Sequence, residues 1–161
     1  MKITEKWLQD KNACESSFNH VKENGYINLN GVDFVKKLIR NKRLSDANWL
    51  IVRIMNKKQK VEYAIFAAEQ AISIFEKKYP EDNRPRNAIN AAKKYLKNPC
   101  KKTKNAADAA ADAADAAAYA AYAAYATDAT DATYAAAYAA AALKIKILNN
   151  GLEILKCISY M

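Results

Sequence analysis

The sequence predicts an all-α fold: a compact multi-helix domain with a C-terminal alanine-rich antiparallel helical hairpin. Three glycines and three prolines in 161 residues are too few for the turns of a strand-rich protein. Apolar residues recur at intervals of three and four, which is typical of amphipathic helices. Between Ala106 and Ala142, 24 of 37 residues are alanine, the strongest helix former.

The alanine-rich stretch is predicted to fold back on itself. Its first polar and aromatic residues follow spacings of four and three, so they share one helix face. Farther along the stretch, the spacing is strictly three. In one straight helix, this spacing would wind the polar and aromatic residues around the whole circumference. A break near Thr127 and Asp128, both good N-cap residues, resolves this conflict and gives helices over 106–126 and 129–148. The alternative is one long surface helix produced by expansion of a short coding repeat.

The remaining helices are predicted from their caps and apolar stripes. In order, we expect a helix from Thr4 or Glu5 to Glu23 that ends at Asn24-Gly25, one after Asn30-Gly31, and one over Asp46–Met55 capped by Ser45. A helix over 57–79 follows, opened by an Asn56–Gln59 capping box, with Ala64, Ala68 and Ala71 on its inner apolar stripe beside Ile65 and Ile72. The next helix has Asp82 as its N-cap and Pro85 in its first turn, and Pro99 closes it. After a polar link over 101–105 and the alanine-rich stretch, the last helix continues through Gly151 with Ile145, Leu148 and Leu152 on one apolar stripe.

Length and charge indicate one domain over 1–161 with two differently charged parts. Residues 1–105 form a basic helical portion with 23 Lys or Arg against 11 Asp or Glu, whereas residues 106–161 hold three against six. The chain lacks a signal-peptide pattern and an uncharged apolar span, so we expect no membrane contact and a cytoplasmic location, the host cytoplasm if a phage encodes it. Three widely spaced cysteines are typical of reduced thiols.

The residues predict no enzyme and no cofactor. Three isolated glycines cannot form a phosphate loop, and a single histidine makes a catalytic triad improbable. His20 is best explained as a partner for a helix C-terminus. Asp108, Asp112 and Asp115 form a carboxylate row of the kind a cation or glycosidase site uses, but a solvated face that keeps an alanine helix soluble explains them better.

Two candidate binding surfaces follow from these patterns. The first is a protein-binding row, because tyrosine is common in binding hot spots, although these tyrosines would equally fill the core or a homodimer seam. It consists of Asp112, Asp115, Tyr119, Tyr122 and Tyr125. The second, the alternative, is a nucleic-acid surface of basic residues interleaved with tyrosine, although lysine-rich surfaces are also common in proteins of AT-rich genomes. It consists of Lys57, Lys58, Lys60, Arg84, Arg86, Lys93 and Lys94.

The segment from Tyr79 to Leu96 has an acidic-Arg-Pro-Arg core followed by an Ala-Ile helix and, later, an alanine-rich region. In these features, and in the Ala13-Cys14 and Trp49-Leu50 helices, the chain resembles a family of predicted immunity proteins, the Imm5-like group, which is common in phages and prophages. The resemblance implies an all-helical, non-enzymatic protein that binds and neutralises a toxin or antagonises a host defence system. It implies no particular functional residues.

The leading hypothesis is therefore a phage or mobile-element inhibitor that binds a bacterial effector, either a toxin or a defence nuclease complex such as a CRISPR component. Its net charge of +9 argues against imitation of DNA. The alternatives are a nucleic-acid-binding accessory protein and a structural module that oligomerises through close alanine helices.

Overall fold

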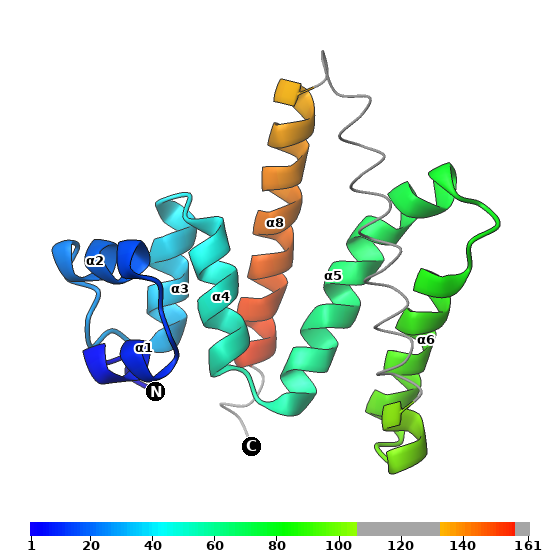
Figure 1. Ribbon diagram of the computed structural model, residues 1–161, viewed down its shortest axis with the longest axis horizontal. Helices are drawn as coiled ribbons and strands as arrows, with labels where there is room; N and C mark the ends of the chain where they lie inside the picture. The colour runs from blue at the N-terminus through cyan, green and yellow to red at the C-terminus, as the bar shows by residue number, and fades with distance from the viewer. Residues whose placement is uncertain (106–132, 157–161) are drawn as a thin grey trace. The chain divides into compact units, whose positions relative to one another are not determined.

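The computed structural model describes residues 1–105 and 133–156; for Ile74, Lys78 and residues 133–139 it describes the backbone only. The described residues form helices, with one isolated antiparallel bridge between Lys2 and Asn30, so the all-α prediction is confirmed. The helices are α1 (Glu5–Asp10), α2 (Glu15–Glu23), α3 (Gly31–Arg40), α4 (Leu44–Ile54), α5 (Lys57–Lys78), α6 (Arg84–Lys97) and α8 (Thr133–Lys156), as Figure 1 shows. Residues 101–105 are also helical.

The chain divides into two compact units. Unit 1 comprises Met1–Met55 and Gly151–Met161, and unit 2 comprises Asn56–Asn150, so the boundary falls within α8. The single domain expected from chain length stays a prediction. In the part of the chain that the structure describes, no helix is both long and apolar enough to cross a membrane.

Unit 1 packs short helices around large apolar side chains. α3 and α4 lie side by side, and their core residues Phe34, Val35, Leu50 and Ile51 are almost completely buried. The extended N-terminus contributes the fully buried Ile3, whose backbone N–H donates to the carbonyl of Leu29 (2.9 Å). Each of these buried side chains removes apolar surface from water, which is the main source of folding free energy.

The single helix expected from Thr4 to Glu23 is wrong. It is split into α1 and α2 because Asn12 adopts a left-handed conformation (φ 54°), a conformation that asparagine tolerates better than most residues. The N–H of Ala13 then donates to the carbonyl of Leu8 (3.0 Å), which ends α1. The predicted stop after α2 is confirmed, since Asn24 is its C-cap and Gly25 has φ 66°.

The start expected for the third helix is also corrected. α4 begins at Leu44, its N-cap is Arg43, and Ser45 lies within its first turn. The preceding Lys42 has φ 58°, so the chain turns there and the helix begins two residues earlier than a Ser45 cap required. This shift places Arg43 beside Asp46, three residues along, and the two side chains form an ion pair.

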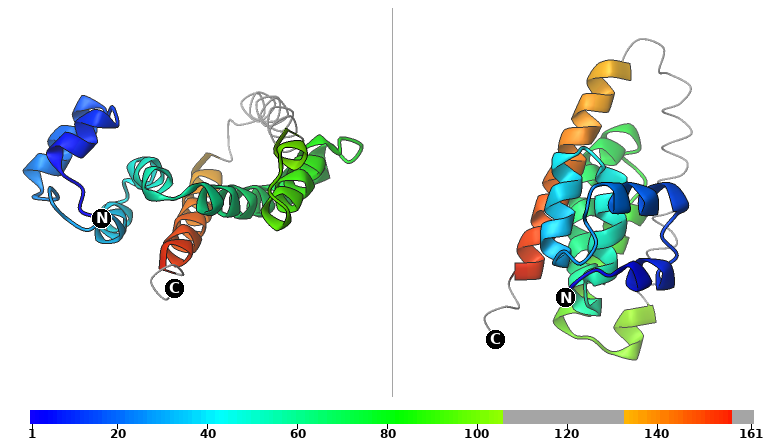
Figure 2. Two further views of the ribbon diagram at one scale, coloured as in Figure 1. Left: turned by 90° about the horizontal axis from the view of Figure 1, so that it is seen from below. Right: turned by 90° about the vertical axis from the view of Figure 1, so that its left-hand side faces the viewer.

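In unit 2, α5 and α6 form an antiparallel hairpin (Figure 2). The predicted capping box opens α5: the Asn56 side chain accepts from the Gln59 N–H (3.0 Å), and the Gln59 side chain accepts from the Asn56 N–H (2.9 Å). Ile65, Ile72 and Ile89 form the buried core, with Val61, Ala92 and Leu96 packed against it. Pro85 lies in the first turn of α6 as predicted.

Several other details of unit 2 differ from the prediction. Ala64, Ala68 and Ala71 of the expected inner stripe are exposed, because the residues of α5 that pack with α6 are centred on Ile65 and Ile72. The N-cap of α6 is Asn83, although the Asp82 carboxylate still accepts from the N–H of Arg84 (3.1 Å).

The polar link expected over 101–105 is helical instead. The Thr103 hydroxyl explains this, since it accepts from the N–H of Cys100 (3.1 Å) and so caps the new turn.

α8 continues through Gly151 as predicted and buries Leu148 and Leu152. Ile145, expected on the same apolar stripe, is exposed (37 %). The expected hairpin turn near Thr127 and the helix over 106–126 lie outside the described residues.

Candidate functional sites

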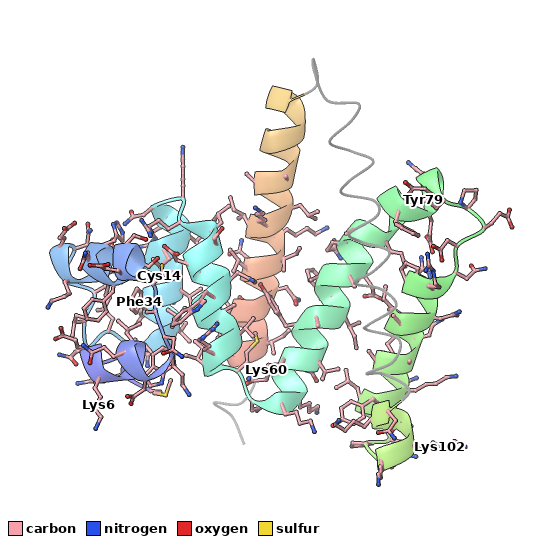
Figure 3. All side chains as sticks on the ribbon, viewed as in Figure 1. Lys6, Cys14, Phe34, Lys60, Tyr79 and Lys102 are labelled. Atoms are coloured by element: carbon pink, nitrogen blue, oxygen red, sulfur yellow. The ribbon has the colours of Figure 1, made fainter. Side chains whose placement is uncertain are left out.

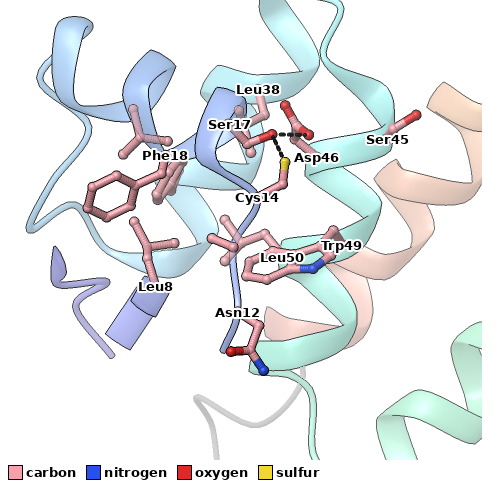
Figure 4. Close-up of a pocket in the computed structure, with 13 residues that line it drawn as sticks. Leu8, Asn12, Cys14, Ser17, Phe18, Leu38, Ser45, Asp46, Trp49 and Leu50 are labelled. Carbon is pink, nitrogen blue, oxygen red and sulfur yellow. Dashed lines mark hydrogen bonds between the residues drawn. The ribbon is translucent and has the colours of Figure 1, made fainter. Parts of the chain in front are cut away.

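A hollow of about 250 Å³ opens at the surface of unit 1, between residues of α1, α2, α3 and α4. Figure 4 shows the side chains around it, most of which are apolar. The lining residues are Leu8, Asn12, Ala13, Cys14, Ser17, Phe18, Val21, Phe34, Leu38, Ser45, Asp46, Trp49 and Leu50. The break at Asn12 makes the hollow, because it turns the chain between α1 and α2 and leaves both helices contributing to one wall.

A chain of hydrogen bonds lies at one edge of the hollow. The Cys14 thiol donates to the Ser17 hydroxyl (3.1 Å), and that hydroxyl donates to the Asp46 carboxylate (2.9 Å; Figure 4). The Arg43 guanidinium donates to Ser17 (3.2 Å) and pairs with Asp46. Since each of these polar groups has a partner within the network, the network adds polarity to the rim without leaving a buried charge unpaired.

The thiol of Cys14 is exposed and precedes the first turn of α2. Hydrogen bonds with Ser17 and then Ser16 lower the pKa of this thiol, and they outweigh burial and the nearby Asp46 carboxylate, which raise it. A lower pKa increases the thiolate fraction, which is the reactive form. No histidine lines the hollow: His20 lies in the last turn of α2, where its Nδ1 is 3.3 Å from the Asn24 amide.

Two tryptophans and an arginine border the same surface. The rings of Trp7 and Trp49 meet edge to face with centroids 6.3 Å apart, and the Arg53 guanidinium lies 4.0 Å from the centre of the Trp49 ring. Both rings are half-buried, and Trp49 also lines the hollow. Cation–π and edge-to-face contacts of this kind hold the rings in place while part of each stays accessible.

The second candidate site is the basic surface of the α5–α6 hairpin. Along its middle, the Arg86 guanidinium donates twice to Glu76 (2.8 and 2.7 Å), and the Lys93 ammonium lies 2.5 Å from Glu69. Glu69 and Glu76 are seven residues apart on α5, as are Lys93 and Arg86 on α6. Two helical turns therefore align the two ion pairs as a ladder across the hairpin.

Ion pairs also engage two more of the predicted nucleic-acid residues. The Arg84 guanidinium binds Asp82 through both carboxylate oxygens, and Lys58 lies 3.8 Å from Glu62. The Arg84 hydrogen bonds lower the pKa of Asp82 to about 2, and those of Arg86 likewise lower the pKa of Glu76. Of the predicted set, Lys57 contacts the Tyr95 ring (5.6 Å), whereas no ion pair engages Lys60 or Lys94 among the described residues.

The predicted protein-binding row, Asp112, Asp115, Tyr119, Tyr122 and Tyr125, lies outside the described residues, as do Asp108 and Cys157. Sequence reasoning missed the hollow entirely. Its network joins Cys14 and Ser17 to Asp46, 29 residues away, and no local motif indicates such a contact. The described residues contain no group of three or more His, Cys, Asp or Glu side chains arranged to hold a metal ion.

A comparison with protein families matches residues 34–146 to a family of unknown function, DUF6931. The chain belongs to this family. The matched range contains the whole α5–α6 hairpin and starts at Phe34 within α3, so α1 and α2 precede it. The DUF6931 match therefore covers one side of the hollow and all of the ion-pair ladder.

No curated protein and no solved structure matches the chain significantly.

Proposed function

We propose that this chain is a non-enzymatic inhibitor that binds a bacterial effector, and that the hollow in unit 1 receives an apolar side chain of that effector. The observation that carries the proposal is the hollow itself, an open apolar cavity with a polar rim on a folded helical unit. The class of effector, a toxin or a defence nuclease complex, comes from the resemblance over Tyr79 to Leu96.

The size of the hollow suits one side chain. An apolar cavity of about 150 Å³ is large enough to bind benzene, so about 250 Å³ accommodates an aromatic or branched aliphatic group. Small-molecule sites are usually larger, from about 300 Å³ upward. Filling the hollow with an apolar group would stabilise the complex by about 25 cal/mol for each Å² of apolar surface removed from water.

The surroundings of the hollow also suit a protein partner. Trp and Arg are over-represented among residues that dominate binding energy, and Trp49 and Arg53 lie together at this surface. Because Cys14, Ser17 and Asp46 already satisfy one another, covering them leaves no unpaired buried donor. The hollow therefore combines an apolar anchor point with a rim that tolerates burial.

The test uses two matched cysteines. Cys14 and Cys100 are both exposed, and both thiols are hydrogen-bonded to a hydroxyl three residues later. Cys14→Phe fills the mouth of the hollow, while Cys100→Phe makes the same change in unit 2. Each variant is used to capture proteins from a bacterial lysate, and the captured protein is then expressed alone to test its toxicity and whether this chain relieves it.

We expect one toxic protein that wild type and Cys100→Phe retain and Cys14→Phe loses, with neutralisation following the same order. Circular dichroism checks that both variants fold. If Cys14→Phe perturbs folding, alkylation of Cys14 in wild type replaces it, since a partner in the hollow should slow that reaction. A captured effector that Cys14→Phe binds equally well, or one that leaves Cys14 alkylation unchanged, would contradict the proposal.

A further inference from the structure

The ion pairs of the α5–α6 hairpin distribute its charge unevenly. Residues 84–105 contain eight Lys or Arg and no Asp or Glu. Glu76 and Glu69 of α5 pair with Arg86 and Lys93, and Asp82 of the connecting loop pairs with Arg84. The carboxylates therefore neutralise the first part of this basic stretch and leave the last part, beyond Lys93, uncompensated by them.

We propose that this last part binds double-stranded nucleic acid through its phosphates. We call it the lysine end and define it as Lys57, Lys94, Lys97, Lys101 and Lys102. All five side chains are exposed, and Figure 3 labels Lys102 where the chain continues beyond α6. Lys57, at the start of α5, belongs to the same end because its ammonium lies 5.6 Å from the ring of Tyr95 near the end of α6.

The type of charge favours phosphate backbone over base edges. Lysine is a compact charge on a flexible stem, which suits phosphates, whereas base recognition relies largely on the planar fork of arginine. The two arginines of α6 are both occupied by carboxylates. Binding at the lysine end should therefore be independent of sequence.

Two further observations favour a duplex over the other anionic partners. Single-strand binding needs open aromatic faces for base stacking, but the Tyr95 ring already faces Lys57. A protein interface needs exposed apolar anchors, and the large hydrophobic residues exposed in the described chain, Met1 and Ile145, lie outside α5, α6 and residues 100–105. Binding to the regularly spaced phosphates of a duplex requires neither open aromatic faces nor exposed apolar anchors.

The experiment compares two triple variants that change the net charge equally. In the first, Lys97, Lys101 and Lys102 of the lysine end are replaced by Gln. In the second, the ion-paired Arg84, Arg86 and Lys93 are replaced by Gln. The affinity of each purified chain for a fluorescent random 20-base-pair duplex is measured by anisotropy between 50 and 200 mM NaCl, with circular dichroism as the folding control.

Each phosphate contact contributes about −0.9 to the slope of log affinity against log salt concentration. Five contacts would therefore lower wild-type affinity by a factor of about 500 over this range. The lysine-end variant should lose about 2.7 from the magnitude of this slope and bind at least tenfold more weakly at 50 mM NaCl, while the ion-paired variant should keep the wild-type slope.

Several results would overturn the proposal. The first two are the absence of duplex binding at 50 mM NaCl and equal slopes for the two triple variants. The third is stronger binding of a single strand of the same length. The fourth is polyglutamate that displaces the chain as well as the duplex does at matched charge, which would indicate an acidic protein surface as the partner instead. Because these measurements need no effector, their failure would leave the proposal for the hollow in unit 1 intact.

Discussion

Unit 1 and the α5–α6 hairpin bury their apolar side chains to different extents. In unit 1, short helices and the N-terminal segment enclose large side chains, so that Phe34, Leu50 and Ile51 are at most 1 % exposed. Among the described residues, α5 and α6 form the core of the hairpin between them, and its residues Ile65, Ile72 and Ile89 stay 5–8 % exposed. The described core of unit 1 is therefore the more completely buried of the two.

The polar groups are also arranged differently in the two regions. Unit 1 gathers Cys14, Ser17, Arg43 and Asp46 into one local network beside an apolar hollow. The hairpin instead uses ion pairs between its helices, and these leave an excess of lysine at one end. We therefore expect unit 1 to bind an apolar anchor and the hairpin to bind an anionic partner.

Truncation of a core side chain should separate the two regions most strongly. Phe34→Ala should lower the free energy of unfolding of unit 1 by about 3–5 kcal/mol, because it removes a large side chain that is only 1 % exposed and leaves unfilled space beside the hollow that Phe34 lines. Ile89→Ala should cost less, about 2 kcal/mol, because Ile89 is smaller than Phe34 and less completely buried.

Urea titrations distinguish these outcomes because both tryptophans, Trp7 and Trp49, lie in unit 1. Their fluorescence follows unit 1, while far-ultraviolet circular dichroism follows all helices. A larger loss for Ile89→Ala than for Phe34→Ala would reverse the proposed difference in burial.

Two asparagine caps provide a matched pair with a smaller effect. Asn30 caps α3 with one hydrogen bond to the N–H of Val32 (3.0 Å), whereas Asn56 caps α5 within a reciprocal pair with Gln59. Asn56→Ala should destabilise the protein by about 1–2 kcal/mol, and Asn30→Ala by about 1 kcal/mol or less. Thermal unfolding monitored by circular dichroism measures both, and a larger loss at Asn30 would contradict the capping-box assignment.

The smallest expected effect is a change in the stability of the hairpin at low pH. Because Arg84 lowers the pKa of Asp82 from 3.8 to about 2 in the folded chain, the ionised carboxylate stabilises the hairpin at neutral pH. This contribution is present above about pH 4 and is lost as the pH falls through about 2. Asp82→Asn keeps a side-chain oxygen that can accept from the N–H of Arg84 but removes the charge. This variant should lose less stability than wild type between pH 4 and pH 2, as followed by the circular dichroism of its helices. An identical pH dependence of the two proteins would rule the ion pair out.

The sequence predicts features whose causes are local. The capping box at Asn56 and Gln59, the stop at Gly25 and the position of Pro85 all depend on residues within one turn, and each is confirmed. The break at Asn12 was missed because the apolar spacing continues across it, and only packing of the chain on both sides selects the left-handed conformation.

The candidate sites also depend on contacts between residues that are far apart in the sequence, so the sequence alone does not predict them. The basic residues of the hairpin are visible in the sequence, but which of them are neutralised depends on the register of α5 against α6, which sets Glu69 opposite Lys93 and Glu76 opposite Arg86. The hollow depends on contacts such as Ser17 to Asp46, which join α2 to α4 and have no signature in the sequence.

The most direct test of the division between the two regions is the alkylation rate of Cys14 and Cys100 in a single wild-type chain, resolved by peptide mass spectrometry. Cys14 lines the hollow, and Cys100 lies between Lys97 and Lys101 of the lysine end. At 50 mM NaCl, a saturating duplex should slow N-ethylmaleimide labelling of Cys100 and leave Cys14 unchanged. The captured effector should slow Cys14 and leave Cys100 unchanged. Protection of Cys14 by the duplex, or of Cys100 alone by the effector, would contradict the account.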